Sequence, residues 1–182
     1  MRVITGSARG RKLKTLDGLD VRPTTEVVKE AVFSIIHFRL PYANVLDLFA
    51  GSGQMGIEAL SRGASKVVFV DNSRRSQEVI KENLASVGLM KQARVIADDA
   101  VSFLQHAADP YDIIFLDPPY DLGYGPKVLP LLGRCLAPEG IILYEHRKGE
   151  EMPEQIGDLS LKKQYTYGKT VVTTYVKAFA EE

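Results

Sequence analysis

The stretch that decides the fold runs from residue 47 to residue 56 and reads Asp47-Leu48-Phe49-Ala50-Gly51-Ser52-Gly53-Gln54-Met55-Gly56. It follows an apolar run typical of a buried strand and leads into a helical pattern. Gly51, Gly53 and Gly56 match the G-x-G-x-x-G spacing of a nucleotide-binding turn. Asp71 lies 20 residues after Gly51, at the end of the next predicted strand, where a carboxylate can accept both hydroxyls of a ribose. Glycines alone can simply permit a tight turn, but strand, loop, helix and acid together predict a nucleotide-like ligand.

Strand-like and helix-like segments alternate after this stretch. Apolar runs at 45–49, 67–70, 94–97, 113–116 and 141–144 predict strands, and segments at 54–61, 73–87 and 101–107 predict helices between them. The runs are nearly continuously hydrophobic, as strands buried on both faces of a parallel sheet must be. We expect a further short helix beginning near Pro130 and an antiparallel hairpin formed by 161–167 and 170–177. The sequence therefore predicts an α/β fold with a doubly wound, mostly parallel sheet and a C-terminal antiparallel hairpin.

The first 22 residues are basic, although the formal charge of the whole chain is zero. They hold six basic and two acidic residues, a local charge of +4. Short β-prone stretches around Gly6 and Gly10 predict a small basic β-hairpin over 2–16, and a helix is expected from 24 to just before Pro41. Such an arm is common in proteins that bind a polyanion, although a solvated surface hairpin would have the same pattern. We therefore divide the chain into an N-terminal basic extension, 1–22, and a main domain, 23–182.

Length and composition limit the class of protein. A chain of 182 residues with 45% apolar and 25% charged residues fits one globular domain and excludes disordered and fibrous classes. Cys135 is the one cysteine, which excludes a disulfide framework and suits a reducing compartment. We find neither the apolar segment of a signal peptide nor the roughly 20 apolar residues of a membrane helix. We therefore expect a cytoplasmic protein without a membrane segment. His37, His106 and His146 lack the spacing of metal ligands, so we expect no metal site.

Asp47 bears on which nucleotide-like ligand the glycine loop would bind. Dinucleotide enzymes hold a pyrophosphate at the helix N-terminus that follows such a loop. A carboxylate just below the loop would repel a pyrophosphate but attract an ammonium or sulfonium group. S-adenosylmethionine carries both cations and no phosphate, so Asp47 favours this cofactor. The alternative is a purely structural role in which Asp47 binds the amides of the loop.

A second motif, Asp117-Pro118-Pro119-Tyr120, directly follows the predicted strand 113–116. The two prolines fix the backbone and remove two N–H donors, so the carbonyl groups of this segment are left as acceptors. The Asp117 carboxylate and one of these carbonyls can bind both hydrogens of a planar exocyclic amine, while Tyr120 stacks on the base that carries it. A rigid loop with an incidental aromatic is the alternative, but open α/β sheets bind ligands at this end of their strands.

A third acidic motif, Asp98-Asp99, ends the predicted strand 94–97. One of the two carboxylates can accept a hydrogen bond from an adenine amine while the other caps the next helix. We expect Asp99 to contact the ligand.

Together these motifs resemble the Rossmann-like S-adenosylmethionine-dependent methyltransferases. The whole chain resembles the RsmD-type family within that class, which methylates the exocyclic N2 amine of a guanine in 16S ribosomal RNA. The glycine loop and the Asp-Pro-Pro-Tyr motif are shared by many amino-methyltransferases, whereas the N-terminal segments narrow the family. The segments that carry the resemblance are Arg2-Val3-Ile4-Thr5-Gly6, Arg22-Pro23-Thr24, the stretch 47–53, Asp117-Pro118-Pro119-Tyr120 and Tyr167-Gly168.

The resemblance implies a role for particular residues, and it makes 23–182 the methyltransferase domain. The methionine end of the cofactor would be surrounded by Asp47, Phe49, Gly51 and Gly53. The ribose would be held by Asp71, with Asn72 also binding the cofactor, and the adenine by Asp99 and Ala100. The target amine would be positioned by the catalytic residues Asp117, Pro118, Pro119 and Tyr120. RNA phosphates would be contacted by Arg2, Arg9, Arg11, Lys12, Lys14 and Arg22.

The implied reaction is direct transfer of a methyl group to the guanine amine, without a covalent enzyme intermediate. The implied partner is 16S ribosomal RNA within the 30S subunit or an assembly intermediate, with the protein acting as a monomer. The nearest alternative is an adenine-N6 DNA or RNA methyltransferase with a similar acidic Pro-Pro-Tyr loop. Such DNA enzymes carry a separate target-recognition region, for which little remains once about 140 residues form the sheet and helices. A nicotinamide-dependent oxidoreductase and a non-catalytic RNA-binding module are further alternatives.

Overall fold

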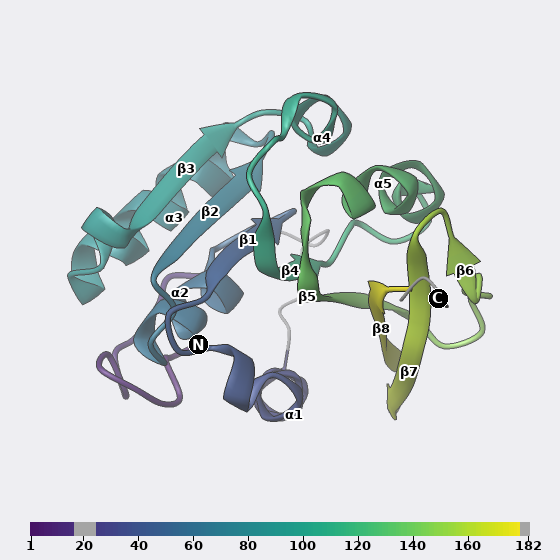
Figure 1. The fold of residues 1–182 in the computed structure, drawn as a ribbon. Coiled ribbons are helices and arrows are strands. Elements are labelled where there is room, and N and C mark those ends of the chain that lie inside the picture. The colour runs from purple at the N-terminus through teal and green to yellow at the C-terminus, as the bar shows by residue number, and fades with distance from the viewer. Residues whose placement is uncertain (17–24, 179–182) are drawn as a thin grey trace.

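In the computed structural model, which describes residues 1–16 and 25–178, eight strands form one sheet (Figure 1). The strands are β1 (Asn44–Leu48), β2 (Lys66–Asp71), β3 (Ala93–Ala97), β4 (Tyr111–Leu116), β5 (Leu136–Arg147), β6 (Gln155–Ile156), β7 (Leu159–Tyr167) and β8 (Thr170–Lys177). Their order is β3-β2-β1-β4-β5-β8-β7-β6. Pairs from β3 to β5 are parallel, and pairs from β5 to β6 are antiparallel. The predicted fold class is confirmed.

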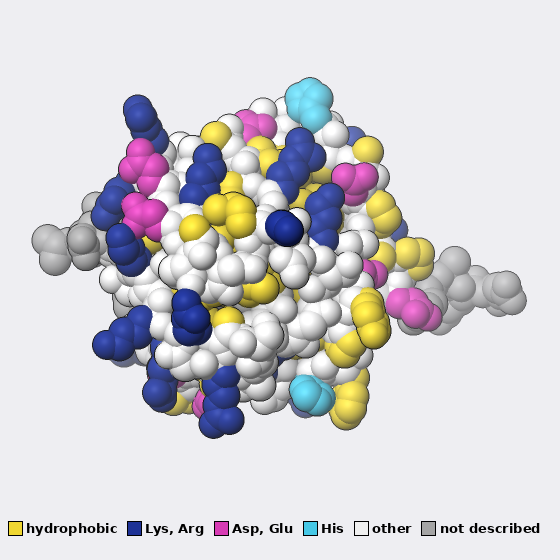
Figure 2. Space-filling model, turned by 90° about the vertical axis from the view of Figure 1, so that its left-hand side faces the viewer, with side chains coloured by type: hydrophobic (Ala, Val, Ile, Leu, Met, Phe, Trp, Pro, Cys, Tyr) yellow, Lys and Arg dark blue, Asp and Glu magenta, His cyan; other side chains and the backbone are white. Residues whose placement is uncertain are grey.

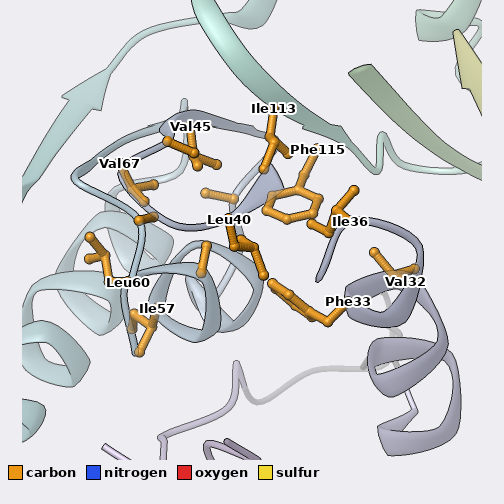
Figure 3. Close-up of a cluster of buried hydrophobic side chains, with 14 of the residues drawn as sticks. Val32, Phe33, Ile36, Leu40, Val45, Ile57, Leu60, Val67, Ile113 and Phe115 are labelled. Carbon is orange, nitrogen blue, oxygen red and sulfur yellow. The ribbon is translucent and has the colours of Figure 1, made fainter. Parts of the chain in front are cut away.

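Helices cover both faces of the sheet (Figure 1). They are α1 (Glu26–Ile35), α2 (Gln54–Ser61), α3 (Arg74–Val87), α4 (Ala100–His106) and α5 (Tyr124–Leu132), with short 3-10 helices at His37–Arg39, Met90–Gln92 and Gly133–Cys135. Successive strand residues face opposite layers: Val45 packs with α1, α2 and α3, whereas Leu46 packs with α4 and α5. Figure 3 shows the first of these layers, in which Phe33 of α1 lies 5.5 Å from Phe115 of β4 between ring centroids. Among the described residues, no helix is both long and apolar enough to cross a membrane.

Local sequence signals explain where the two helices beside β2 begin and end. Ser73 caps α3 by accepting a hydrogen bond from the Ser76 amide, and Gly88 ends it in the left-handed region at φ +73°. Gly53 begins α2 at φ +81°. A Cβ on Gly56 would lie 2.3 Å from the Phe69 ring, so this glycine allows α2 to pack closely on β2.

The prediction of a short helix beginning near Pro130 is wrong, because α5 begins at Tyr124 and contains that proline in its last turn. The proline removes one helical hydrogen bond, but only two helical residues follow it. Val128, Leu129 and Leu132 are buried on the sheet. Burial of this apolar face stabilises the helix by more than the missing hydrogen bond costs. Helix propensity alone does not include this stabilisation.

Residues 1–16, here called the N-terminal loop, pack against α2 and α3. The predicted hairpin is reduced to a loop closed by one β-bridge between Arg2 and Lys12. Val3 and Leu13 are buried in the core, and a Cβ on Gly6 would lie 1.8 Å from the Ser61 carbonyl oxygen. The expected Arg22-Pro23-Thr24 segment and the start of the first predicted helix at 24 lie outside the described residues.

A buried charge cluster fastens the N-terminal loop to the helices. The Glu58 carboxylate of α2 accepts hydrogen bonds from the amides of Ile4 (2.7 Å) and Thr5 (3.0 Å), and it pairs with Lys29 (3.1 Å) and Arg62 (3.0 Å). Burial alone would raise the pKa of Glu58, but these donors outweigh it and lower that pKa below its usual value. No local pattern in the sequence indicates this cluster, because its members come from three separate segments.

Candidate active site

The described residues enclose a large cavity at the carboxyl ends of β1, β2, β3 and β4. Its volume is about 1770 Å³. A small-molecule site occupies roughly 300–1000 Å³, so the cavity has room for a cofactor and a second, flat group. The cavity lies where β1 separates β2 from β4, the point at which strand order reverses and open α/β sheets bind ligands.

The structure brings most of the predicted site residues to this cavity. Its lining includes Asp47, Phe49, Gly51, Asp71, Asn72, Asp99, Ala100, Asp117, Pro118, Pro119 and Tyr120. Gly53 is absent from the lining and lies at the N-cap of α2. None of the described basic residues predicted to contact RNA lines the cavity, although Met1, Thr15 and Leu16 of the N-terminal loop do. Arg22 lies outside the described residues.

The glycine loop has an unusual backbone. Phe49 has φ +60°, a left-handed conformation that is strained for an aromatic residue, and Gly51 has φ +59°. The Phe49 ring packs against Tyr124 at 5.0 Å between centroids. The Gly51 amide donates to Asp71 Oδ2 at 2.9 Å, which ties the loop to the end of β2. The strain is therefore held in place by contacts on both sides of the loop.

Asp47 is buried below this loop, with 4% of its surface exposed. Its Oδ2 accepts a hydrogen bond from the Gly56 amide at 3.0 Å. Asp47 therefore binds a backbone amide, as expected if its role is structural. Burial and, to a smaller extent, the nearby Asp71 raise the pKa of Asp47, which reaches about 8 despite the opposing Gly56 hydrogen bond. A cation placed beside Asp47 would favour its ionised form. The structural role and the proposed ligand-binding role are therefore compatible.

The acids at the ends of β2 and β3 are oriented by backbone amides. Asp71 accepts from Gly51 and also from the Ser73 amide at 2.9 Å. Asp99 caps α4, because its Oδ2 accepts from the Ser102 amide at 3.1 Å. Asp98 accepts from the Asp99 amide at 2.8 Å and also lines the cavity. The expected division, in which Asp99 contacts the ligand and Asp98 caps the helix, is therefore wrong for the cap, which is formed by Asp99 through one of its two carboxylate oxygens.

The loop 117–120 faces the cavity from the end of β4 and is fixed by an arginine from β5. The Arg147 guanidinium lies over the Tyr120 ring, 4.7 Å from its centroid. The same guanidinium pairs with Asp121 at 3.0 Å, and Asp121 has a left-handed φ of +64°. Arg147 therefore holds two consecutive residues at the end of the predicted catalytic motif.

Several cavity residues escaped the sequence analysis. They are Gln54, Met55, Glu145, Arg147, Lys148 and Lys169. The last three meet because β5 pairs with β8: the Lys148 amide donates to the Lys169 carbonyl at 2.9 Å. Residues more than 20 positions apart give no local motif, so only the strand pairing could have revealed them. The described part of the chain contains no group of His, Cys, Asp and Glu side chains placed to hold a metal ion.

Most of the predicted RNA-binding bases in the N-terminal loop already have partners in the described structure. Arg2 pairs with Glu26 at 3.3 Å, and Lys14 pairs with Glu82. Arg11 donates to the Ser86 carbonyl. Arg9 and Lys12 are exposed. Figure 2 views the face that carries β3, α3 and the N-terminal loop, where Lys and Arg side chains are more frequent than Asp and Glu.

Comparisons with known proteins agree with this geometry. A family model described as Conserved hypothetical protein 95 matches residues 1–176. The chain is 43% identical to "Putative rRNA methyltransferase YlbH" of Bacillus subtilis, over 97% of this chain and 99% of that protein. It is 34% identical to Ribosomal RNA small subunit methyltransferase D of Escherichia coli K12, over 96% of this chain and 89% of that protein.

A solved structure has the same fold along nearly its full length. This structure is "Putative methyltransferase yhhF from Escherichia coli", with a TM-score of 0.88 and 33% identity over 97% of both chains. The matches in family, sequence and structure all extend over nearly the whole chain. The chain therefore belongs to the Conserved hypothetical protein 95 family, the RsmD-type family that its motifs resemble.

Proposed function

We propose that the protein is an S-adenosylmethionine-dependent methyltransferase that modifies the exocyclic N2 amine of a guanine in 16S ribosomal RNA. One observation carries the proposal: a single cavity joins acids at the ends of β1, β2 and β3 to the loop 117–120 at the end of β4. The names of the relatives, ribosomal RNA small subunit methyltransferase D, support the substrate. The adenine-N6 alternative is not favoured by these relatives.

The residues of the cavity fit the cofactor, which supplies a methyl group on a positively charged sulfur. Asp71, held at the end of β2 by the Ser73 amide, would accept from ribose hydroxyls, next to Asn72. Asp99 and Ala100 at the end of β3 suit an adenine amine. Asp47, below the loop of Phe49, Gly51 and Gly53, suits the cationic methionine end. Because β1 pairs with β4, that end would lie beside the loop 117–120.

The loop 117–120 would position the guanine for direct transfer. The Asp117 carboxylate and a proline-flanked carbonyl accept the two N–H groups of the amine, which directs the nitrogen lone pair toward the methyl group. Tyr120 stacks on the base. Proximity supplies most of the rate, since effective molarities of about 10⁵–10⁸ M are available to well-oriented groups. No strong base is needed, because the nitrogen becomes acidic once it carries the methyl group.

The proposal also covers partners and location. We propose that the protein acts as a monomer. The N-terminal extension, 1–22, would contact RNA phosphates through Arg2, Arg9, Arg11, Lys12, Lys14 and Arg22. The RNA substrate implies action in the cytoplasm, on the 30S subunit or an assembly intermediate.

Mapping of the methylated nucleotide tests the proposal. Purified protein and labelled S-adenosylmethionine are incubated with unmethylated 30S subunits, naked 16S ribosomal RNA or DNA, and the products are digested and identified by mass spectrometry. We expect N2-methylguanosine at one site in the ribosomal RNA, and a loss of at least about tenfold in single-turnover rate for Asp117→Ala. Methyladenosine as the product, incorporation into DNA alone, or full activity of Asp117→Ala would contradict it.

A further inference from the structure

Gln54 has a buried side-chain oxygen that finds no hydrogen-bond donor in the structure. Its Oε1 is the one buried side-chain oxygen or nitrogen of the described residues without such a partner. Only 8% of the residue is exposed, and it lines the large cavity. A buried carbonyl without a donor costs about 1–3 kcal/mol, and such groups in native structures call for an explanation. A bound group that supplies an N–H is one explanation.

The position of Gln54 indicates which part of a ligand would supply that donor. Gln54 is the first residue of α2, directly after the glycine loop that leaves β1. In the proposed function, Asp71 at the end of β2 and Asp99 at the end of β3 accept the donors of the ribose and of the adenine amine, and both acids line the cavity. The end of β1 lies beside β4, where the methyl group would be transferred. The cofactor donor that remains is the ammonium group of its methionine part, which carries three N–H bonds.

We propose that Gln54 is a cofactor-binding residue whose Oε1 accepts a hydrogen bond from the α-ammonium group of S-adenosylmethionine. This inference rests on the proposed function. Asp47 supplies a second acceptor for the same ammonium group from below the loop. The start of α2 also offers the positive end of the helix dipole, which suits the α-carboxylate on the same carbon atom.

Calorimetric binding of two ligands by the variant Gln54→Leu tests the inference. S-adenosylhomocysteine carries the ammonium group, whereas 5′-methylthioadenosine lacks the whole amino-acid part. Hydrogen bonds to charged groups contribute about 1.5–3 kcal/mol, so we expect Gln54→Leu to lose about tenfold or more in affinity for S-adenosylhomocysteine. Its affinity for 5′-methylthioadenosine should stay unchanged. The unliganded variant should also unfold at the same or a higher temperature, because it no longer buries an unpaired oxygen.

Met55 provides the matched control, since it is the next residue of α2 and also lines the cavity. Met55→Leu conserves side-chain volume and should bind both ligands as the wild type does. Unchanged affinity of Gln54→Leu for S-adenosylhomocysteine, or an equal loss for both ligands, would overturn the inference. If the wild type bound neither ligand, the proposed function itself would fail, and this outcome is distinct from failure at Gln54.

Discussion

At the scale of single residues, the cavity holds groups whose state depends on what is bound. Asp47 is the clearest case, because burial raises its pKa to about 8 in the free protein. At neutral pH this carboxyl group holds its proton. A cationic ligand beside it would lower that pKa and release the proton. Cofactor binding and proton release are thereby coupled at one side chain.

We predict that affinity for S-adenosylhomocysteine rises with pH between about 6 and 8 and then levels off. Below the free-state pKa of about 8, binding must displace a proton from Asp47, which costs at most about tenfold in affinity per pH unit. Calorimetry in buffers of different ionisation enthalpy measures the released proton directly. The variant Asp47→Asn should show neither effect. A pH-independent affinity in the wild type would contradict the coupling.

Arg147 provides a second prediction at this scale. Arg147→Ala removes both the stacking on Tyr120 and the pair with Asp121, so the loop 117–120 loses its support. We expect a fall of about three- to thirtyfold in the single-turnover methylation rate, since an exposed cation–π contact contributes about 0.5–1 kcal/mol and an exposed ion pair about 0.2–1 kcal/mol.

The variant Arg147→Lys retains the charge but not the planar stacking, so its methylation rate should lie between those of the wild type and of Arg147→Ala. Affinity for S-adenosylhomocysteine should stay at the wild-type value in both variants. Wild-type rates in both variants would show that Arg147 does not position the loop.

At the scale of elements, local sequence signals predicted a helix or strand well where interactions between residues close in the chain determine its ends. The cap Ser73 and the stop Gly88 delimit α3 as expected. The prediction failed at Pro130, because the burial of Leu129 and Leu132 is a tertiary effect that overrides proline propensity. It also treated the first hairpin as a purely local structure, whereas the N-terminal loop is shaped by α2 rather than by strand pairing.

Glu58 gives a prediction about this docking. Glu58→Gln removes the charge that balances buried Lys29 and Arg62, so the free energy of unfolding should fall by about 3–5 kcal/mol in urea denaturation. The control Glu78→Gln breaks only an exposed pair with Arg74 and should change little.

The contribution of Glu58 to the free energy of unfolding depends on pH, and the direction follows from its pKa. The pKa of Glu58 is lower in the folded than in the unfolded protein, so its contribution is present above the unfolded pKa. It is lost as pH falls through the folded pKa. The acid-induced part of the loss in stability should therefore be smaller in Glu58→Gln than in the wild type.

At the scale of the whole molecule, the sequence predicted the cavity residues at the carboxyl ends of the parallel strands better than those from β5 and the C-terminal hairpin. Acids and glycines at strand ends follow from local motifs, and the structure places Asp71 and Asp117 in one cavity as expected. Arg147 and Lys169 belong to the last strands and their turn, and they join the cavity only through the antiparallel pairing of β5 with β8. Long-range pairing of this kind leaves no pattern in the neighbouring sequence.

Charge in the N-terminal loop gives a prediction for RNA binding. Replacing Arg9, Arg11 and Lys12 by alanine should weaken binding to a 16S ribosomal RNA transcript and flatten its salt dependence. In single-stranded RNA, the slope of log K against log salt falls by about 0.7 for each phosphate that the protein no longer neutralises, or about 2 for three phosphates.

The control replaces three exposed lysines outside the cavity lining, Lys127, Lys162 and Lys163. It should leave the slope unchanged, and both variants should bind S-adenosylhomocysteine as the wild type does. Equal salt slopes in the wild type and both triple variants would show that these three bases of the N-terminal loop do not contact RNA phosphates.

The central place of β1 in the sheet has a consequence for the order of folding. β7 and β8 are joined by a short turn, and such hairpins form within about 1–10 μs. The pairing of β1 with β4 joins Val45 to Ile113 and must first close a long intervening loop, which slows folding. In pulse-labelled hydrogen exchange we expect amides of β8 facing β7 to gain protection before those of β1 facing β4. The pair of central strands whose carboxyl ends carry the cavity would then be the last part of the sheet to assemble.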